Sequence, residues 1–511
     1  MSSNGSAVRA LGWIPLAAAA YTAATLIRYY LAAPSPRFPV ESAFLNFIGL
    51  GVIGVLVRRG SVKDAEGAED AVAPRLTLLA TVLVAAAFII YGPAMGIGLL
   101  SDDFVIARWA ERLELVHFEA TGFVRPGVPA FWWMLRLLPG DFAVAAHVAN
   151  IVLHGVNGAL VSLIAARLGL RRAEAVAAGV MFVLFPGLSE AIVWLSGVQD
   201  VLMATLTLTA VALATADEPR LVAAVAASAA ALFVKETAVV TPVLAGLVIV
   251  GRDGLHVSRR KRIVLGALAA VAATYVVARA SAGLPSSFLT VSDGRYFAKQ
   301  LIAGPFAALG APWTDDWGRT HALVALVRAF AIVALVAAAF FRWRRDDATF
   351  RAAAACAGWV LAAVLPVFSL FYVGPQLEGA RYLYLPAAGF TMLLALVMGV
   401  ILDRIVRRSR SVTIGLMAAA LVVPVLPAIR SDIGRWQAAA ATRQHVLERV
   451  TDQADRWGCT AFTVEGDADS VSGAYVFRHG LTEALARERA ASEVRCRVVV
   501  RPGEFGMTRE P

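Results

Sequence analysis

Residues 76–104 read LTLLATVLVAAAFIIYGPAMGIGLLSDDF, a long apolar run that ends in a serine and two aspartates. A helix needs about 20 apolar residues to cross a bilayer, because the hydrocarbon core is about 30 Å thick. An unbroken helix also satisfies its own backbone hydrogen bonds, which lipid cannot do. This stretch therefore predicts a transmembrane helix that carries two carboxyl groups to one membrane surface.

The composition of the whole chain agrees with this stretch. Of the 511 residues, 59% are hydrophobic and 16% are charged, and three are cysteines. Soluble globular proteins are about one quarter charged, so this composition excludes a water-soluble enzyme, a disordered chain and a disulfide-rich secreted scaffold. The net charge of +10 comes from arginines in short loops, so it indicates a membrane protein and no nucleic-acid partner.

Thirteen apolar segments can be drawn, and they predict an all-α polytopic membrane protein with about 13 transmembrane helices. Every second loop is basic, which is the pattern of cytoplasmic loops. This alternation predicts a cytosolic N-terminus, an odd number of crossings and a place in the cytoplasmic (inner) membrane. A signal peptide is the alternative for the first segment, but Arg28 interrupts its apolar run. The segments lie near residues 11–31, 42–57, 76–99, 142–168, 173–188, 201–216, 221–234, 238–250, 263–283, 322–341, 352–373, 385–402 and 412–429.

The segments and loops divide the chain into four parts. Residues 1–58 predict a transmembrane hairpin, residues 59–75 a cytosolic linker, residues 76–430 the transmembrane core, and residues 431–511 a small extracytoplasmic α/β cap. Two neighbouring core segments are short, so we expect them to be tilted, kinked or re-entrant.

The cap has its own pattern of helices and strands. Helices are expected over 435–456 and 481–489, and strands over 460–464 and 495–500. Cys459 and Cys496 lie at the ends of these strands, in the predicted oxidising compartment. A disulfide between them is therefore the hypothesis, with two buried free thiols as the alternative.

Ionisable groups at membrane depth are costly and are candidates for function. The first group is Ser101, Asp102 and Asp103, which follow the apolar run directly. One reading is a helix N-cap, in which these side chains accept hydrogen bonds from free N–H groups. The other is a carboxylate held at the outer membrane surface as a general base.

The segment 142–168 carries a polar stripe on one helical face. His147, Asn150, His154 and Asn157 fall within an arc of about 80° at 100° per residue. They could bind a ligand, or they could hydrogen-bond to neighbouring helices. A metal site is disfavoured, because the two histidines are about 10 Å apart along the helix axis.

Three further groups lie at predicted helix ends. Pro186 and Gly187 break a helix ahead of Glu190 and Trp194, which are expected to share a helical face with Gly197; a broken helix with a carboxylate usually lines a cavity. Lys235 and Glu236 separate the two short segments and allow an internal ion pair. Arg381, Tyr382 and Tyr384 meet the membrane surface, where snorkelling and an aromatic belt are the simpler explanation.

In this order the motifs resemble the GT-C glycosyltransferase superfamily, over about residues 76–435. They are most similar to the membrane halves of TPR-bearing, protein-O-mannosyltransferase-like proteins. The chain departs from these in its tail of about eighty residues, which is too short for an array of ~34-residue repeats. The motifs are the acidic pair, FVRP at 123–126, the His/Asn stripe, SEAIVWLSG at 189–197, KET at 235–237 and RYLYLP at 381–386.

The resemblance implies a polyprenyl-phosphate-linked sugar as donor, with a mannosyltransferase as the nearest likeness. The acceptor would be a hydroxyl of a protein, a glycan or a lipid, and the reaction would invert the anomeric centre. A single carboxylate suffices as base, because phosphate leaves as an anion and needs no acid. Asp102 or Asp103 is expected to be that base. Some relatives use a divalent cation, but the sequence shows no clear ligand cluster.

The remaining roles follow from charge and ring chemistry. A guanidinium is always charged and forms a fixed fork, so Arg381 is the first candidate for the donor phosphate. Candidates for the phosphate and lipid head are Arg381, Tyr384, Arg125, Lys235 and Arg328, and candidates for the acceptor or sugar are Glu190, Trp194, His147, Asn150 and His154.

Two other functions remain open from the sequence. A transporter or flippase for a lipid-linked substrate would show internal pseudo-symmetry and paired broken helices, and no such symmetry is apparent. A catalytically inactive scaffold would keep a pocket but place Asp102, Asp103 and Arg381 far apart.

Overall fold

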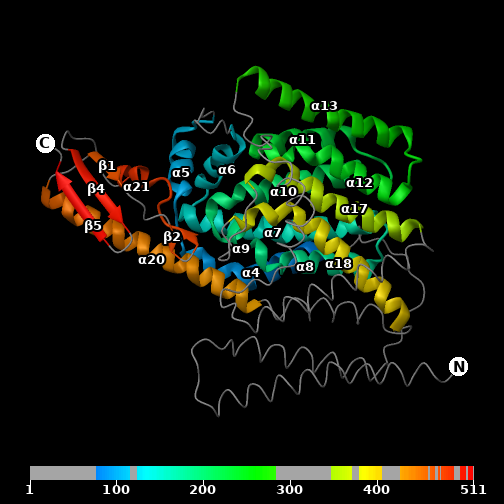
Figure 1. Ribbon diagram of the computed structural model, residues 1–511, viewed down its shortest axis with the longest axis horizontal. Helices are drawn as coiled ribbons and strands as arrows, with labels where there is room; N and C mark the ends of the chain where they lie inside the picture. The colour runs from blue at the N-terminus through cyan, green and yellow to red at the C-terminus, as the bar shows by residue number, and fades with distance from the viewer. Residues whose placement is uncertain are drawn as a thin grey trace, which may run out of the picture.

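The computed structural model describes most of the core and much of the tail. The described residues are 76–115, 124–283, 347–370, 379–405, 426–457, 461–465, 470–471, 473–487, 495–501 and 504–509. Nearly all the regular structure before residue 458 is helical, and the strands come after it. Figure 1 shows the strands β1 (Ala461–Glu465), β4 (Arg495–Arg501) and β5 (Glu504–Arg509) beside the C-terminal end of α20 (Leu426–Trp457), away from the body of packed helices.

Within the described ranges, six helices are long and apolar enough to cross a membrane. A bent pair, Arg172–Val183 with Pro186–Val193, makes a seventh if it is one span. The chain therefore has the fold of a helical membrane protein, as the sequence predicts. The predicted segments at 11–31, 42–57 and 322–341 lie outside the described residues, as does the segment at 412–429 up to residue 425. The six helices are Leu76–Gly96, Phe142–Arg167, Leu195–Ala214, Arg259–Ser281, Ala348–Val367 and Ala380–Gly399.

Several helices are followed or preceded by short 3-10 turns, some of which lie close to the candidate site. The elements before residue 406 are α4 (Leu76–Tyr91), η2 (Gly92–Gly96), α5 (Asp102–Arg112), α6 (Gly127–Arg136), α7 (Phe142–Arg167), α8 (Arg172–Val183), η3 (Pro186–Leu188), α9 (Ser189–Val193), η4 (Leu195–Gly197), α10 (Val198–Ala214), α11 (Leu221–Val234), η5 (Glu236–Val240), α12 (Thr241–Asp253), α13 (Arg259–Ser281), α17 (Asp347–Val364), η6 (Leu365–Leu370), η7 (Ala380–Leu383) and α18 (Tyr384–Ile405).

The two short segments form helices that are too short to cross a bilayer alone. Helix α11 has 14 residues and α12 has 13. At 1.5 Å per residue, 14 residues span about 21 Å, less than the ~30 Å hydrocarbon core. The turn η5 separates them at Glu236–Val240. A pair of charged residues thus lies where two half-length helices meet.

The break between α8 and α9 has a local cause. Pro186 begins the 3-10 turn η3, and the two helices on either side are bent by 53°. Proline lacks a backbone N–H and cannot continue the hydrogen-bond ladder of the preceding helix. The bend leaves Glu190, on α9, buried inside the bundle with 2% exposure.

Glycines let the central helices approach closely. A Cβ built on Gly179 of α8 would lie 2.3 Å from the carbonyl oxygen of Gly158 on α7, and one on Gly155 would lie 2.5 Å from Cα of Val84 on α4. Small residues allow such contacts between membrane helices, where apolar packing against lipid gives no advantage. Helix α7 is therefore held between α4 and α8, with its polar stripe buried.

The tail combines one long helix with short strands. Strands β1 and β4 pair in parallel and β5 adds antiparallel to β4, with Phe462 opposite Cys496. The two-stranded pair β2–β3 is separate. Cys459 lies outside the described residues, so the disulfide stays a prediction, as does the side of the membrane that the tail occupies. The elements are α20 (Leu426–Trp457), β1 (Ala461–Glu465), β2 (Ser470–Val471), β3 (Ala474–Tyr475), α21 (Leu481–Arg487), β4 (Arg495–Arg501) and β5 (Glu504–Arg509).

Candidate functional site

A cavity of about 630 Å³ lies where helices and short turns from residues 102 to 483 converge. It has apolar and aromatic walls and several charged side chains, the usual character of a ligand site. The charged residues among its lining are Asp102, Glu114, Arg125, Asp200, Lys235, Glu236, Arg381 and Glu483, and the uncharged polar and aromatic ones include Trp109, Trp194, Ser196, Gln199, Tyr382 and His479.

The two neighbouring aspartates have different surroundings. Asp102 lines the cavity and is partly exposed, and its Oδ1 accepts one hydrogen bond of 3.2 Å from Ser101 Oγ. Asp103 is fully buried and does not line the cavity. Of the acidic pair, Asp102 is therefore the carboxylate that can meet a bound molecule.

Asp103 holds two elements of the site together from a position outside the cavity lining. Its Oδ2 accepts the Leu100 N–H at 2.8 Å, and its Oδ1 accepts the Ser196 N–H at 2.7 Å and the Ser196 hydroxyl. Burial raises the pKa of Asp103 to about 8, although these hydrogen bonds act in the opposite direction. Asp103 thus ties the start of α5 to the turn η4.

The N-cap reading of this segment is wrong in its details. Helix α5 begins at Asp102, but Ser101 makes no capping hydrogen bond through its side chain. Asp103 reaches backward to the N–H of Leu100 and across to Ser196. Asp103 therefore makes a tertiary contact in place of a cap, whereas Asp102 bonds only to the neighbouring Ser101.

Three cations line the cavity, and each has a carboxylate partner. Arg381 Nη1 lies 2.8 Å from Glu190 Oε1, and the Arg381 backbone N–H donates to Glu190 Oε2 at 3.0 Å. Lys235 Nζ lies 2.5 Å from Asp200. These pairs hold two cations at fixed positions while leaving some of their N–H groups without protein acceptors.

The third cation, Arg125, is more completely engaged. Its Nε donates to Glu236 Oε2 at 2.9 Å, its Nη2 forms a second bond to Glu236, and its Nη1 donates to Gln199. Burial would lower the pKa of Arg125, but Glu236 outweighs this and raises it, and Arg125 in turn lowers the pKa of Glu236. Both members of this pair are charged, and Arg125 has few donors left for a ligand.

The internal Lys235–Glu236 ion pair is therefore wrong. Lys235 pairs with Asp200 on α10, and Glu236 pairs with Arg125 ahead of α6. The two adjacent side chains leave the chain in different directions, because Lys235 is extended at the end of α11 and Glu236 opens the turn η5.

Aromatic rings surround the Arg381 guanidinium. Its Cζ lies 4.8 Å from the ring of Trp194, 5.2 Å from that of Tyr382 and 5.8 Å from that of Tyr475. Lys235 Nζ is 5.4 Å from the same Tyr382 ring, so the two cations flank one aromatic side chain. Cation–π contacts of this kind help to hold a partly buried cation in place.

Trp194 connects the acidic and cationic sides of the cavity. Its indole N–H donates to the Leu100 carbonyl at 3.2 Å, while its ring lies against Arg381. The expected common helical face of Glu190, Trp194 and Gly197 is wrong, because α9 ends at Val193 and Trp194 is extended. This break turns the indole toward Leu100 and Arg381.

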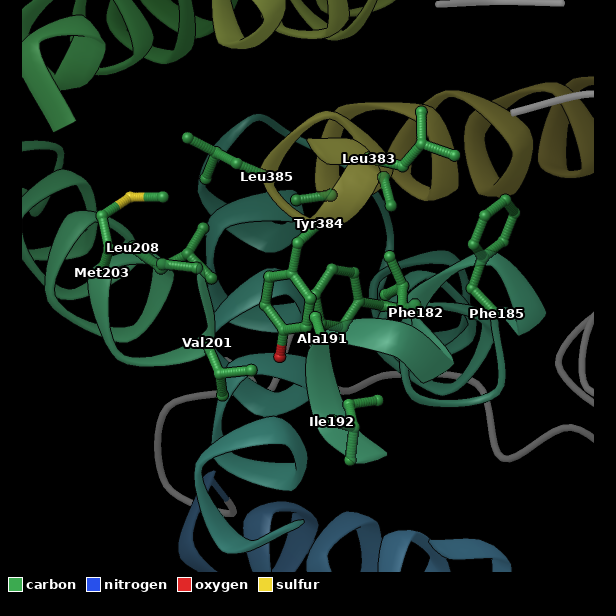
Figure 2. Packing of buried hydrophobic residues seen from close by; sticks show 14 of the residues in the cluster. Phe182, Phe185, Ala191, Ile192, Val201, Met203, Leu208, Leu383, Tyr384 and Leu385 are labelled. Carbon is green, nitrogen blue, oxygen red and sulfur yellow. The ribbon is translucent and has the colours of Figure 1, made fainter. Parts of the chain in front are cut away.

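The polar stripe of α7 lies in the protein interior, outside the cavity lining. His154 Nδ1 is 2.8 Å from the Tyr384 hydroxyl and its Nε2 is 3.0 Å from the Val183 carbonyl oxygen, and Asn157 Nδ2 donates to Tyr384 at 3.1 Å. Figure 2 shows the Tyr384 hydroxyl pointing into the packed interior between Phe182 and Val201. These residues connect helices, as the hydrogen-bonding alternative predicts.

The other stripe residues are also enclosed. Asn150 Nδ2 donates to the Ile192 carbonyl at 3.4 Å, and His147 is 0% exposed. None of His147, Asn150, His154 and Tyr384 lines the cavity. Glu190 lies behind Arg381 and is its ion-pair partner. Arg328 is outside the described residues.

The sequence patterns did not point to several cavity residues. Asp200 and Gln199 follow the SEAIVWLSG motif but were not expected to act, and His479, Gly480 and Glu483 come from the tail. No local pattern marks these tail residues, because their nearest cavity neighbours are hundreds of residues away in the chain. Across the described ranges, no three His, Cys, Asp or Glu side chains form a group that could hold a metal ion.

No known protein-family model matches this sequence, and no curated protein matches it significantly.

Proposed function

We propose that this protein is a membrane glycosyltransferase that moves a sugar from a polyprenyl-phosphate donor to a hydroxyl acceptor. One observation carries the proposal: Asp102, which has no ion-pair partner among the described residues, shares a single cavity with Arg381 and Lys235. A base and phosphate-binding cations facing one space are what this transfer requires.

The reaction needs a base for the acceptor hydroxyl and cations for the leaving phosphate. The Asp102 carboxylate takes the proton of the acceptor hydroxyl while the acceptor oxygen bonds to the anomeric carbon. The bond from that carbon to the phosphate oxygen breaks, and polyprenyl phosphate leaves as an anion. One carboxylate is sufficient, unlike glycoside hydrolysis, which uses two. A single displacement inverts the anomeric centre.

Arg381 and Lys235 are the groups that would stabilise the departing phosphate. Each is already paired with a carboxylate, yet Arg381 uses only Nη1 of its guanidinium and Lys235 only one of three N–H donors in these bonds. Both contact Tyr382, which keeps them on the same side of the cavity. Preorganised donors of this kind lower the barrier because they need no rearrangement during the reaction.

The main alternative is a transporter or flippase of a lipid-linked substrate. Inverted-repeat transporters carry broken helices in matching positions of two halves. In the described part of the chain there is one such bent pair, α8 with α9. Charged residues at helix ends, grouped around one cavity, support the enzyme over the transporter.

A transfer assay tests the proposal directly. Purified full-length protein in detergent is incubated with radiolabelled polyprenyl-phosphate mannose and alcohol, glycan and peptide acceptors. We expect labelled acceptor and released polyprenyl phosphate in equal amounts. Movement of the labelled donor across the membrane of proteoliposomes without cleavage would instead support the transporter. If the protein shows neither transfer nor movement of the donor, both functions are refuted.

A further inference from the structure

The tail forms one wall of the cavity. The segment between β3 and α21, together with the first residues of α21, contributes His479, Gly480 and Glu483 to the lining that also contains Asp102. His479 is exposed, and the Glu483 side chain is partly exposed. The part predicted as a separate cap is therefore continuous with the candidate site.

Backbone contacts join this wall to the residue before Asp102. The Ser101 N–H donates to the Val476 carbonyl at 2.9 Å, and the His479 N–H donates to Ser101 Oγ at 3.2 Å. A Cβ built on Gly480 would lie 2.5 Å from the Ser101 carbonyl oxygen, and Gly480 has a φ of +88°. Only glycine fits this approach without strain.

Ser101 itself has an unusual backbone. Its φ of 50° and ψ of −121° are rare for a residue with a side chain. Such a conformation persists only where the surroundings enforce it, and it is common at functional sites. The tail supplies these surroundings, so it takes part in setting the direction of Asp102.

The tail also contacts Trp194 and lies close to Arg381. Trp436 of α20 stacks on Trp194 at 6.1 Å between ring centroids, and Tyr475 of β3 lies 5.0 Å from Trp194 and near Arg381. The same unit therefore touches both chemical groups of the proposed reaction.

Charge indicates what this wall would accept. The cavity cations are paired with carboxylates, whereas Asp102 and Glu483 have no cationic partner among the described residues. Two carboxylates without cationic partners would repel an anionic acceptor. Hydroxyl-rich neutral molecules would meet hydrogen-bonding groups from His479 and Glu483.

We propose that the segment Val476–Glu483 is the acceptor wall of the site, with His479 and Glu483 selecting an uncharged, hydroxyl-rich acceptor such as a neutral glycan. This inference rests on the proposed function and names its acceptor class. Donor binding, by contrast, is assigned to Arg381 and Lys235, which come from other parts of the cavity lining.

The first test measures acceptor choice. The probes are octyl mannoside, which is neutral, and octyl glucuronide, which is anionic, with release of polyprenyl phosphate as an independent measure of donor turnover. We expect KM for the neutral probe to be at least ~10-fold lower, a difference of about 1.4 kcal/mol. Glu483→Lys should remove or reverse this preference while changing donor KM less than about twofold.

The second test pairs a geometric measurement, which does not need activity, with a kinetic one. A Ser101→Cys/His479→Cys pair, with Cys459 and Cys496 replaced by serine, should form a disulfide in the folded protein, detected as protection from alkylation. Gly480→Ala should raise acceptor KM, whereas Gly434→Ala on α20, where an added Cβ meets nothing within 4 Å, should not.

The outcomes separate the two proposals. Absence of donor turnover by the parent protein would overturn the proposed function and this inference with it. Donor turnover with equal use of both probes, or a Cys pair that stays fully alkylated, would overturn the acceptor wall alone.

Discussion

Two polar clusters lie among the apolar helices that the structure describes, and they differ in charge and in access. The cluster around Asp102 contains three cations and several carboxylates and opens onto a cavity. The cluster around His154 contains no carboxylate, lysine or arginine, and both His154 and Tyr384 are 0% exposed. Its hydrogen bonds link α7 to α8, α10 and α18. In the sequence both are polar residues within apolar stretches.

The difference shows what distinguishes a site from a helix contact. His154 has a partner for each ring nitrogen, and the Tyr384 hydroxyl meets both His154 and Asn157. Satisfied polar groups of this kind hold helices in register. Around the cavity, Asp102, Arg381 and Lys235 keep bonding capacity toward open space, and that capacity is available to a ligand.

The largest effect is expected from Asp102→Asn. An amide cannot accept the acceptor proton, and general-base catalysis contributes about 10²–10⁴-fold, so transfer should fall by that factor. The measurement is kcat with labelled donor, alongside thermal unfolding to show that the fold is intact. Asp102→Glu, which keeps the carboxylate, should recover part of the rate. Full activity in Asp102→Asn would remove the cavity from consideration as the active site.

Glu190→Gln should mainly destabilise the charged cluster. It leaves the Arg381 guanidinium, whose side chain is 19% exposed, without its carboxylate; breaking a fully buried pair typically costs about 3–5 kcal/mol, so this partly exposed pair should cost less. The unfolding midpoint should drop clearly. The matched control is Asp217→Asn, since the Arg252–Asp217 pair is exposed and such pairs contribute about 0–1 kcal/mol. Equal effects of the two variants would contradict the buried Glu190–Arg381 pair.

Tyr384→Phe tests the uncharged cluster. It removes the partner of His154 Nδ1 and one of the two acceptors of Asn157 Nδ2, which should cost about 1–3 kcal/mol of stability with little change in kcat. Tyr91→Phe is the control, because the buried Tyr91 hydroxyl has no hydrogen-bond partner in the described part of the chain. A loss of transfer far beyond the loss of stability in Tyr384→Phe would make the α7 stripe part of the site.

The smallest effect concerns the pH dependence of stability. Asp103 has a pKa of about 8 when folded against about 3.9 when unfolded, so between these values the folded state holds a proton that the unfolded state has lost. Stability should therefore fall as pH rises from 6 to 8, by at most about 1.4 kcal/mol per pH unit, and level off above that.

Two variants test whether Asp103 causes this pH dependence of stability. In Asp103→Asn the unfolding midpoint should be lower overall but should lose this part of its pH dependence, because nothing titrates at the position. In Asp102→Asn the dependence should persist. An unchanged slope in Asp103→Asn would show that another group is responsible.

The sequence predicts the helices and their main break correctly, but it fails where tertiary contacts change the local structure. The apolar runs predict the helices α4, α7, α10, α13, α17 and α18, and Pro186 predicts the bend, because both depend on local chemistry. The N-cap role for Ser101 and the common helical face of Glu190 and Trp194 failed. They failed because a local rule assumes that a helix continues or begins regularly, and here tertiary bonds interrupt it.

The sequence by itself determined that this chain is a helical membrane protein, since bilayer thickness and backbone hydrogen bonding leave apolar segments little choice. It also showed which polar residues lie at the ends of those segments. Only the tertiary structure decided which aspartate meets the cavity, which carboxylate pairs with each cation, and that the tail forms a wall. Such pairings join residues like Arg125 and Glu236, 111 positions apart, and no local pattern can encode a contact that depends on how separate helices pack.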